Sequence, residues 1–594
     1  MAASVAPLWP AFAQSSPALR DRVPSDEVIY FALPDRFANG DPSNDRGGIT
    51  GDRLKSGYDP ADAGFYHGGD LAGLTARLDY IQGLGTTAIW LGPIYKNKPV
   101  QGAAGHESAG YHGYWIVDFT DVDPHFGTKA DLKTLVDAAH ARGLKVYLDI
   151  ITNHTADVIQ YRDCPVGSCA YRSKADYPYS RKGGVGGVAI NDGFGGDGPG
   201  NQTAANFAEL TRSDYAYETV VPRGEARAKT PDWLNDPRYY HNRGDTNWAG
   251  ESLTYGDFSG LDDLFTEHPR VVEGFIEIYG RWIDEFGVDG FRVDTARHVN
   301  PEFWQAFVPA MLARAKARGI PNFHIFGEVS DVDPGVLARF TRADGYPAVL
   351  DFAFQRAVTD AVNGQGGTSQ LARLFASDAL YEGGGKAALQ LPTFLGNHDM
   401  GRIGGFIAKA HPEASGDELL ARDTLAHAML MFLRGVPVIY YGDEQGFTGD
   451  GDDRNAREDM FASQVASYND NRLIGGGSGS ADRYDADAAL YRRISAMAKV
   501  RSDNPVLRQG LQVVRATSDQ PGLFAVSRRL DGREGLIAFN TSDAAVTVQV
   551  EVDTASLAWR ALQGYCPSAP SAPGSYTVRL APFQYMVCVS EVSR

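Results

Sequence analysis

The stretch Gly290–His298 contains residues whose types and spacing could do chemistry. Arg292 and Asp294 lie two positions apart in a run whose Val and Phe favour a strand, so their side chains are expected on one face. An arginine beside a carboxylate keeps that carboxylate ionised at neutral pH, as a nucleophile requires. The segment alone predicts either an activated nucleophile or an ordinary salt bridge at a strand end.

Three other candidate strands also end in polar residues: the segments are 149–154, Glu328 and 397–399. Together with Asp294 these segments supply the acids Glu328 and Asp399 and the histidines His154 and His398, and three acids with two histidines suit glycoside hydrolysis. In that reaction one carboxylate attacks the sugar carbon and a second protonates the leaving oxygen. Glu328 follows the apolar run 325–327 with no adjacent cation, which predicts the raised pKa that such an acid needs.

These residues require a scaffold that brings strand ends together. From about residue 70 onward, helices closed by a glycine alternate with buried strands, which is typical of parallel α/β units. The eight strand candidates are 28–33, 87–91, 146–150, the strand that opens at Gly290, 323–326, 348–354, 391–395 and 436–441. Eight strands close a (β/α)8 TIM barrel, whose chemistry sits at the strand ends. A doubly wound open sheet would not gather so many ends around one centre.

The alternation of helices and strands is interrupted twice. Residues 155–264 form a Gly/Asp/Tyr-rich stretch too long for a simple loop, which predicts an inserted subdomain after the third strand. Short alternating strands over 510–594 predict a C-terminal antiparallel β-sandwich domain. The catalytic barrel is then expected over 24–154 and 265–509, and residues 1–23 are expected to be a signal-peptide remnant or N-terminal tail.

Composition and charge narrow the partners and the compartment. The 594 residues carry a net charge of −18, which argues against nucleic acid or an anionic membrane as partner, and no apolar run has the length of a membrane span. We expect a monomer. The run Ala11–Ala13 is similar to a signal-peptide cleavage site, but the charged n-region is missing. The close pairs Cys164 with Cys169 and Cys566 with Cys588 suggest two disulfides, with four reduced thiols as the alternative; we expect a periplasmic or secreted protein.

From about residue 24 to its end, the chain resembles the α-amylase family, glycoside hydrolase family thirteen, in particular exported bacterial α-amylases. Four motifs occur in the family's order at the ends of the expected strands. The resemblance implies that Asp294 is the nucleophile with Arg292 as its partner, that Glu328 is the general acid/base, and that Asp399 grips the sugar's hydroxyls. It also implies that His154 and His398 bind hydroxyls at the cleavage subsite, with Asp149 supporting the site from beneath.

Further residues are implied to bind the sugar chain. The run Tyr111–Trp115 follows the second strand, and aromatic rings near a carboxylate cluster are natural stacking platforms. The resemblance gives Tyr114 that role, with His112 and Trp115 beside it; core packing is the alternative for Tyr111 and Trp115. Four other candidates complete the set: the pair Asp453 and Arg457 toward the non-reducing end, Arg297 where many relatives have lysine, and His298.

Two Ca²⁺ sites are expected. The loop 39–45 packs oxygen ligands at short spacing, and Gly68–Asp70 follows; oxygen ligands suit Ca²⁺, although a solvated Asx turn is the alternative. The loop resembles one in cyclodextrin-forming amylases, which implies as ligands Asn39, Asp41, Asn44, Asp45, the Gly68 carbonyl and Asp70. The second site, implied more widely in the family, would use Asn153, Asp263 and the His298 carbonyl.

The resemblance implies a retaining hydrolase that cleaves α-1,4 bonds of starch or maltooligosaccharides through a glycosyl-aspartate intermediate. A transglycosylase on the same scaffold differs in whether water or an acceptor resolves that intermediate. A non-catalytic glucan-binding relative would be expected to lack at least one of the acids, and all three are present. One β domain after the barrel disfavours the longer cyclodextrin glucanotransferase layout.

Overall fold

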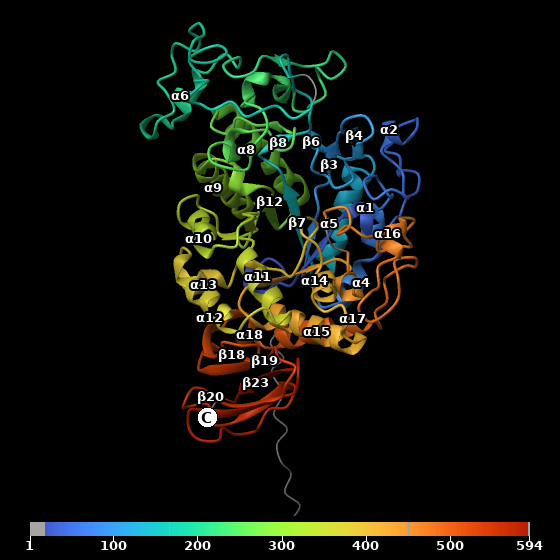
Figure 1. The fold of residues 1–594 in the computed structure, drawn as a ribbon, viewed down its shortest axis with the longest axis vertical. Coiled ribbons are helices and arrows are strands. Elements are labelled where there is room, and N and C mark those ends of the chain that lie inside the picture. Colours follow the sequence, from blue (N-terminus) through green and yellow to red (C-terminus); the bar gives the residue numbers. More distant parts are fainter. Residues whose placement is uncertain (1–17, 165–166, 450–451, 592–594) are drawn as a thin grey trace, which may run out of the picture.

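The computed structural model describes residues 18–164, 167–449 and 452–591. Its centre is an eight-stranded parallel sheet in the order β14-β13-β12-β7-β2-β1-β16-β15. Figure 1 labels two neighbouring strands of this sheet, β7 and β12. The two edge strands, β14 and β15, approach each other: the Asp351 backbone N–H, just after β14, donates to the Pro392 carbonyl of β15 at 2.9 Å. The predicted TIM barrel is confirmed. Its strands are β1 (Ile29–Ala32), β2 (Ala88–Leu91), β7 (Lys145–Ile150), β12 (Gly290–Val293), β13 (His324–Gly327), β14 (Ala348–Val349), β15 (Pro392–Thr393) and β16 (Val436–Tyr440).

The sixth strand is shorter than predicted. Only Ala348–Val349 pair with β13, and the predicted end of the strand belongs to helix α11 (Phe352–Val362). The cause is local, because the Asp351 side chain accepts from the Phe354 backbone N–H and caps the helix at its N-terminus. The outer helices are α3 (Leu71–Ala76), α4 (Leu78–Gly83), α5 (Lys129–Ala141), α8 (Pro269–Phe286), α9 (Pro301–Ala317), α10 (Pro334–Arg342), α15 (Gly416–Phe432) and α17 (Ala489–Asp503).

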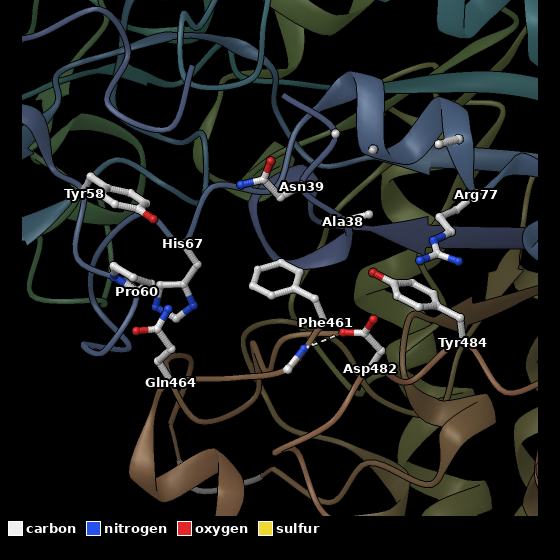
Figure 2. Close-up of a pocket in the computed structure, with 14 residues that line it drawn as sticks. Ala38, Asn39, Tyr58, Pro60, His67, Arg77, Phe461, Gln464, Asp482 and Tyr484 are labelled. Carbon is white, nitrogen blue, oxygen red and sulfur yellow. Dashed lines mark hydrogen bonds between the residues drawn. The ribbon is translucent and has the colours of Figure 1, made fainter. Parts of the chain in front are cut away.

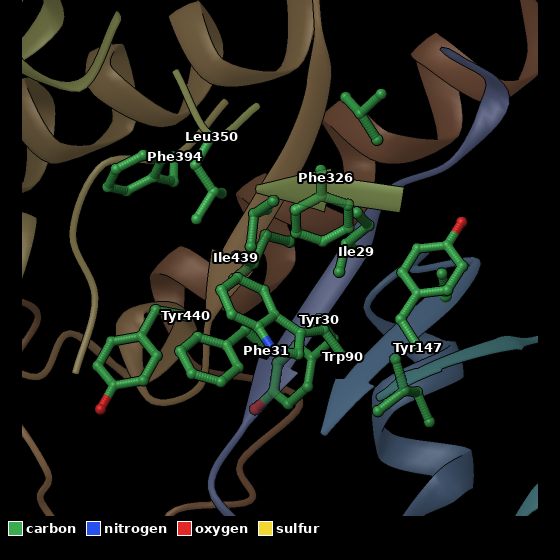
Figure 3. Close-up of a cluster of buried hydrophobic side chains, with 14 of the residues drawn as sticks. Ile29, Tyr30, Phe31, Trp90, Tyr147, Phe326, Leu350, Phe394, Ile439 and Tyr440 are labelled. Carbon is green, nitrogen blue, oxygen red and sulfur yellow. The ribbon is translucent and has the colours of Figure 1, made fainter. Parts of the chain in front are cut away.

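Aromatic side chains fill the barrel interior (Figure 3). The Phe31 ring stacks on Trp90 with centroids 3.8 Å apart, and Trp90 meets Phe326 edge to face at 5.7 Å. The Trp90 indole N–H then donates to Asp149 Oδ2 at 3.1 Å. This packed layer therefore also orients a carboxylate at the carboxyl end of β7.

The long stretch after β7 is built from short elements on a two-stranded base. Strand β8 (His154–Thr155) pairs antiparallel with β11 (Asp262–Asp263), and the chain between them packs a separate small core around Tyr179, Phe207 and Tyr215. A disulfide joins Cys164 and Cys169 within it. Figure 1 places this excursion at the opposite end of the molecule from the C-terminal strands.

Two further segments were not expected from the sequence. The first is a hairpin of β3 (Tyr95–Asn97) and β6 (Ile116–Val122), inserted between β2 and α5. The second is the connection 443–488 after β16, whose described residues form only two short helices, η7 (Asp443–Gln445) and α16 (Ala466–Asn469). Buried polar contacts hold this second connection: Arg402 Nη1 forms an ion pair with Asp443 at 3.1 Å, and His67 Nδ1 lies within hydrogen-bond distance of Asp459 at 2.7 Å.

The C-terminal part is antiparallel, as predicted. One sheet has the order β17-β18-β19-β23-β21 and the other pairs β20 with β22; a shared core including Trp559, Tyr576 and Met586 lies between them. The strands are β17 (Leu511–Ala516), β18 (Leu523–Leu530), β19 (Arg533–Asn540), β20 (Val546–Glu551), β21 (Trp559–Gln563), β22 (Ser575–Leu580) and β23 (Tyr585–Ser590). A disulfide joins Cys566 and Cys588, so both suggested pairings are confirmed.

The structure describes only part of the predicted N-terminal tail. The cleavage-like run Ala11–Ala13 lies outside the described residues. The last residues of the predicted tail contact the barrel: Arg22 donates to the Gly143 and Thr87 carbonyls at 2.9 and 3.0 Å, at the end where β7 and β2 begin. Within the described ranges, no helix combines the length and the apolar character that a membrane crossing requires.

Candidate active site

A cleft of about 980 Å³ opens where the barrel strands end. Strand ends, loops of the excursion and the 443–488 connection all contribute to its walls. Twelve predicted residues line it together: His112, Tyr114, Trp115, His154, Asp294, Arg297, His298, Glu328, His398, Asp399, Asp453 and Arg457. The cleft lies at the C-terminal face, where barrels of this kind carry their functional residues.

The buried Arg292 guanidinium is the centre of the carboxylate cluster. Its Nη1 lies 2.7 Å from Asp149 Oδ1 and 2.8 Å from Asp294 Oδ1, and its Nη2 lies 2.8 Å from Glu328 Oε2. The strand register explains this convergence, because Arg292 lies opposite Asp149 on β7, and Val293 lies opposite Gly327 on β13. Asp294 follows two residues after Arg292 on the same face. One cation therefore contacts three carboxyl groups.

Glu328 has a cation beside it, contrary to the expectation from its sequence neighbours. Arg292 approaches from the adjacent strand, a contact that the local sequence does not reveal. Glu328 Oε2 also accepts from the Thr295 backbone N–H at 3.0 Å. Thr295 has a positive φ of 45°, which is unusual for a β-branched residue and turns the chain sharply after Asp294.

The pKa of Glu328 is nonetheless raised, to about 7. Burial is the largest cause, Arg292 opposes it, and the negative charges of Asp294 and Asp399 raise the pKa further. Burial likewise raises the pKa of Asp149 to about 8. Burial also leaves the pKa of Asp294 above its ordinary value, although Arg292 lowers it as expected. Three carboxyls sharing one guanidinium therefore retain a proton near neutral pH.

Asp399 is in a different electrostatic environment. Its side chain is 46% exposed in the cleft, and Arg457 Nη2 lies 3.0 Å from its Oδ1. Desolvation opposes ionisation, but His398, Arg457 and Arg292 outweigh it and hold the pKa of Asp399 below its usual value. Arg457 is itself fixed by bonds to the His398 carbonyl at 2.9 Å and the Tyr111 hydroxyl at 3.1 Å. Asp399 is therefore an ionised carboxylate next to a partly protonated cluster.

The aromatic and histidine side chains form one wall of the cleft. The Tyr114 hydroxyl bonds to His398 Nε2 at 2.8 Å and donates to Asp149 Oδ2 at 3.1 Å, and its ring lies nearly parallel to His398. Burial lowers the pKa of His398 to about 3 and that of His154 to about 4, so both rings are neutral at pH 7. Tyr111 is buried, as the core-packing alternative predicted, whereas the partly exposed Trp115 lines the cleft.

Arg297 is partly exposed and contacts the loop after Glu328. Its Nη1 donates to the Ser330 carbonyl at 2.8 Å and lies 3.2 Å from Asp331 Oδ2. The cleft residues that the sequence analysis missed include two exposed apolar side chains nearby: Trp248, 51% exposed, and Val332, 59% exposed. Trp248 belongs to the irregular excursion, and no periodicity or motif there distinguishes it.

The loop predicted to bind Ca²⁺ gathers its oxygens around a glycine. A Cβ at Gly68 would approach Asp45 Oδ1 to 2.7 Å and Asn39 Nδ2 to 2.8 Å. Asn44 Oδ1 is buried without a hydrogen-bond partner. Asp70 accepts from three backbone N–H groups: those of Gly40 at 3.0 Å, Asp41 at 2.8 Å and Gly73 at 2.6 Å. The all-oxygen donors and the orphaned amide oxygen fit a hard cation.

The second predicted cation site has a competing partner. Asp263 Oδ2 lies 2.6 Å from His241 Nδ1, and His241 Nε2 lies 2.9 Å from Glu267. Burial opposes protonation of His241, but the two carboxylates raise its pKa to about 9. A cationic histidine thus already neutralises Asp263. Across the described ranges, no group of three or more His, Cys, Asp or Glu side chains could hold a metal. Amide and carbonyl oxygens, which both predicted sites also use, are not among these side chains.

The (β/α)8 barrel carries its cluster of acids at the carboxyl ends of the strands. This arrangement places the protein in the class of TIM-barrel proteins whose functional sites lie at that face. Residues 31–519 match the family model described as the α-amylase catalytic domain. The chain therefore belongs to the α-amylase family.

Known relatives agree with this assignment. An α-amylase of Streptomyces lividans is 46% identical over 92% of this chain, which spans 58% of that protein. The crystal structure of an Anoxybacillus α-amylase is 27% identical, with a TM-score of 0.69 over 96% of this chain and 99% of that one. A cyclomaltodextrin glucanotransferase described as having a three-domain ABC distribution is 26% identical, with a TM-score of 0.69 over 95% of this chain and 99% of that one.

We expect Arg292→Met to destabilise the fold by about 3–5 kcal/mol at pH 7.5, because it leaves buried carboxylates without their cation. The loss should be smaller at pH 5.5. Asp149 and Glu328 already have pKa values of about 8 and 7, and without the guanidinium the folded state takes up still more protons than the unfolded chain. Stability then falls as pH rises through these values. Urea denaturation at both pH values measures the difference.

The surface variant Arg314→Met is the matched control. Arg314 pairs with Asp284, whose pKa its hydrogen bonds to Arg314 and Arg318 lower to about 2. Its loss should cost under about 1 kcal/mol and should not change between pH 5.5 and 7.5. A cost for Arg292→Met that is equal at both pH values would contradict the shared-proton description.

Proposed function

We propose that this protein is a retaining hydrolase that cleaves α-1,4-glucosidic bonds of starch and maltooligosaccharides. The arrangement of Asp294 and Glu328 carries the proposal, since they contact the two Nη nitrogens of one guanidinium at 2.8 Å each. Such sharing favours the short carboxyl separation of about 5 Å in retaining enzymes over the roughly 6.5–9.5 Å of inverting ones.

The proposed reaction has two steps. A carboxylate oxygen of Asp294 attacks the anomeric carbon while Glu328 gives its proton to the departing glycosidic oxygen, so a glycosyl-aspartate and a free chain end form. Glu328, now ionised, then takes a proton from a water molecule whose oxygen attacks the same carbon and releases Asp294. The raised pKa of Glu328 supports its part as the acid. Asp149, beneath Arg292, is assigned a supporting part only.

The surrounding residues are proposed to bind the sugars. Ionised Asp399 accepts hydrogen bonds from hydroxyls, while neutral His154 and His398 offer ring nitrogens to others. Tyr114 provides an aromatic face for the sugar at the cleavage point. Arg457 holds Asp399 and pairs with Asp453, which supports a place for this pair toward the next sugar.

A transglycosylase is the second candidate function. The exposed Trp248 and Val332 give the rim near Arg297 an apolar surface that could hold an acceptor sugar rather than water. The layout does not argue against this candidate, because a relative described as a cyclomaltodextrin glucanotransferase also has three domains. A single β domain is therefore a weaker argument for hydrolysis than the sequence suggested.

We further propose an exported monomer that acts on an α-glucan, with neither nucleic acid nor a membrane as partner. The two disulfides support an oxidising compartment, the periplasm or the medium. The proposed units are the barrel, 24–154 with 265–509, the inserted subdomain 155–264 and the β domain 510–594. The antiparallel β8–β11 pair at the base of the excursion supports the inner boundaries.

Ca²⁺ is proposed as a structural ligand of the loop 39–45. The buried, unpaired Asn44 Oδ1 and the space that Gly68 leaves beside Asp45 support this loop; the ion pair of Asp263 with His241 makes the second site a weaker candidate. A bound cation would neutralise the acidic loop and link it to Asp70 at the start of α3.

A digest of starch, maltooligosaccharides, pullulan and sucrose tests the reaction. We expect reducing ends to accumulate from starch and maltooligosaccharides, with the α-configuration retained in the first product seen by NMR. Asp294→Asn and Glu328→Gln should each lower kcat at least about a thousandfold, because each removes a group that acts at the reacting atoms. Transfer products without free reducing ends would establish the transglycosylase instead, and full turnover by Asp294→Asn would refute the mechanism.

The pH dependence of kcat/KM should report the Glu328 proton. Glu328 acts as an acid, so kcat/KM should fall as pH rises through about 7, the pKa of this group. In Asp399→Asn the alkaline limb of the residual activity should shift to lower pH, because the substitution removes a negative charge that raises the pKa of Glu328. Asp453→Asn, 50% exposed at the side chain, should leave the limb in place. An alkaline limb near pH 9 in the unmodified protein would contradict this assignment.

Removal of Ca²⁺ should lower the melting temperature. A ligand that binds only the folded state at a hundred times its Kd adds about 2.7 kcal/mol, so Ca²⁺ added back to chelator-treated protein should restore the melting temperature. Asn44→Ala should abolish this restoration, whereas Asn201→Ala, which removes a hydrogen bond to the Gly195 carbonyl outside both sites, should not. Restoration that survives Asn44→Ala but is lost in Asp263→Asn would place the ion at the second site.

A further inference from the structure

A second cavity, of about 530 Å³, lies beside the barrel mouth and shares no lining residue with the cleft. It is formed by the loop after β1, by helix α3 and by the 443–488 connection after β16. These loops follow the carboxyl ends of adjacent strands. The cavity therefore opens on the same side of the barrel as the cleft.

Aromatic rings and polar side chains, Arg77 and Asp482 among them, line this cavity together (Figure 2). In Figure 2 the Phe461 ring projects between His67 on one side and Asp482 with Tyr484 on the other. Phe461 is partly exposed and has no ring contact with another aromatic side chain in the described part of the chain. Elsewhere in the protein, aromatic rings of the interior pack against one another, so this ring has room for a ligand.

The neighbouring rings are fixed in place. The Tyr484 hydroxyl donates to the Phe37 carbonyl, and the Arg77 guanidinium lies 3.9 Å from the Tyr484 ring centroid. Tyr58 bonds through its hydroxyl to Asp45. The walls are thus preorganised, which lowers the cost of ordering side chains when a ligand binds.

Two polar side chains in the cavity have unused hydrogen-bonding capacity. Asp482 Oδ1 accepts from the Ala462 N–H at 2.9 Å, and its other oxygen has no partner among the described residues. The exposed Gln464 amide likewise makes no hydrogen bond within the described ranges. Near these free groups there is one arginine, Arg77, and one unpaired carboxylate. The balance of charge favours a neutral ligand with many hydroxyls over a phosphate or a cation.

The cavity is also close to the cleft along the chain. Arg457 lines the cleft and Phe461 lines the cavity, and the four-residue step between them spans at most roughly 14 Å. A polymer of sugars can therefore occupy both places with one strand. Binding at two places on one polymer raises the effective concentration of the second contact.

We propose that this cavity is a second α-glucan-binding site, in which Phe461 stacks on a glucose ring and Gln464 and Asp482 bind its hydroxyls. The proposal rests on the proposed function, because the ligand is a segment of its polymeric substrate. The cavity volume falls in the range of pockets for small ligands, so it takes a short segment rather than a long chain. Its effect is to hold the polymer near the cleft without taking part in bond cleavage.

Native gels that contain soluble starch test the site. In a Glu328→Gln background, which prevents digestion, the changes Phe461→Ala and Gln464→Ala together should weaken starch retention about tenfold, or about 1.4 kcal/mol. Gln464→Ala alone, a surface change without lost contacts, should weaken it about threefold and keeps the test valid if Phe461→Ala misfolds. Tyr565→Ala, an exposed ring (66%) on the C-terminal domain, is the matched control and should bind like the parent.

Maltotetraose turnover by the same variants with Glu328 intact separates the two sites. It should stay within about twofold of the unmodified protein, because a short substrate uses the cleft alone. Unchanged starch retention in both pocket variants, or turnover that falls in parallel with retention, would overturn the second site. If the unmodified protein fails to turn over maltotetraose while retention still depends on Phe461, the cavity stands and the proposed function falls. Absence of both turnover and starch retention in the unmodified protein would refute both.

Discussion

The site depends on one guanidinium placed among three carboxyl groups. Arg292 is fully buried, and its contacts with Asp149, Asp294 and Glu328 come from three adjacent parallel strands. The positive charge of Arg292 offsets part of the cost of burying these acids. One positive charge is too little to keep all three carboxyl groups ionised, so a proton remains in the cluster near neutral pH. The barrel brings the three carboxyl groups close to one another, because parallel strands end at one edge of the sheet. At that short range the three groups compete strongly for the single positive charge.

The remaining parts of the structure adapt this centre to a ligand. The aromatic layer beneath it fixes Asp149 through Trp90. The connection after β16 carries Arg457 into the cleft, where it holds Asp399, and continues to Phe461 in the second cavity. Buried pairs of Arg402 and His67 fix this irregular segment. Polar networks thus replace regular secondary structure where the chain must reach the ligand.

Sequence reasoning was most reliable where local signals are strong. Periodicity and glycine stops located all eight strands, but the sixth and the seventh were drawn too long, the sixth because the helix cap at Asp351 went unrecognised. The acids at strand ends were identified because their residue types are unusual after apolar runs. Trp248 could not be identified, since an irregular segment has no period from which the position of a side chain can be inferred. Phe461 was missed for the same reason.

By itself, the sequence determined the barrel, its interrupted helix–strand order, the cysteine pairs and the acids at the strand ends. These features depend on backbone preference, hydrophobic period and spacing, which are local properties of the chain. Only the tertiary structure decided that Arg292 contacts Glu328 and that His241 neutralises Asp263. Charges interact through space and through the burial around them, so residues distant in the chain set each other's pKa, and no local pattern records that proximity.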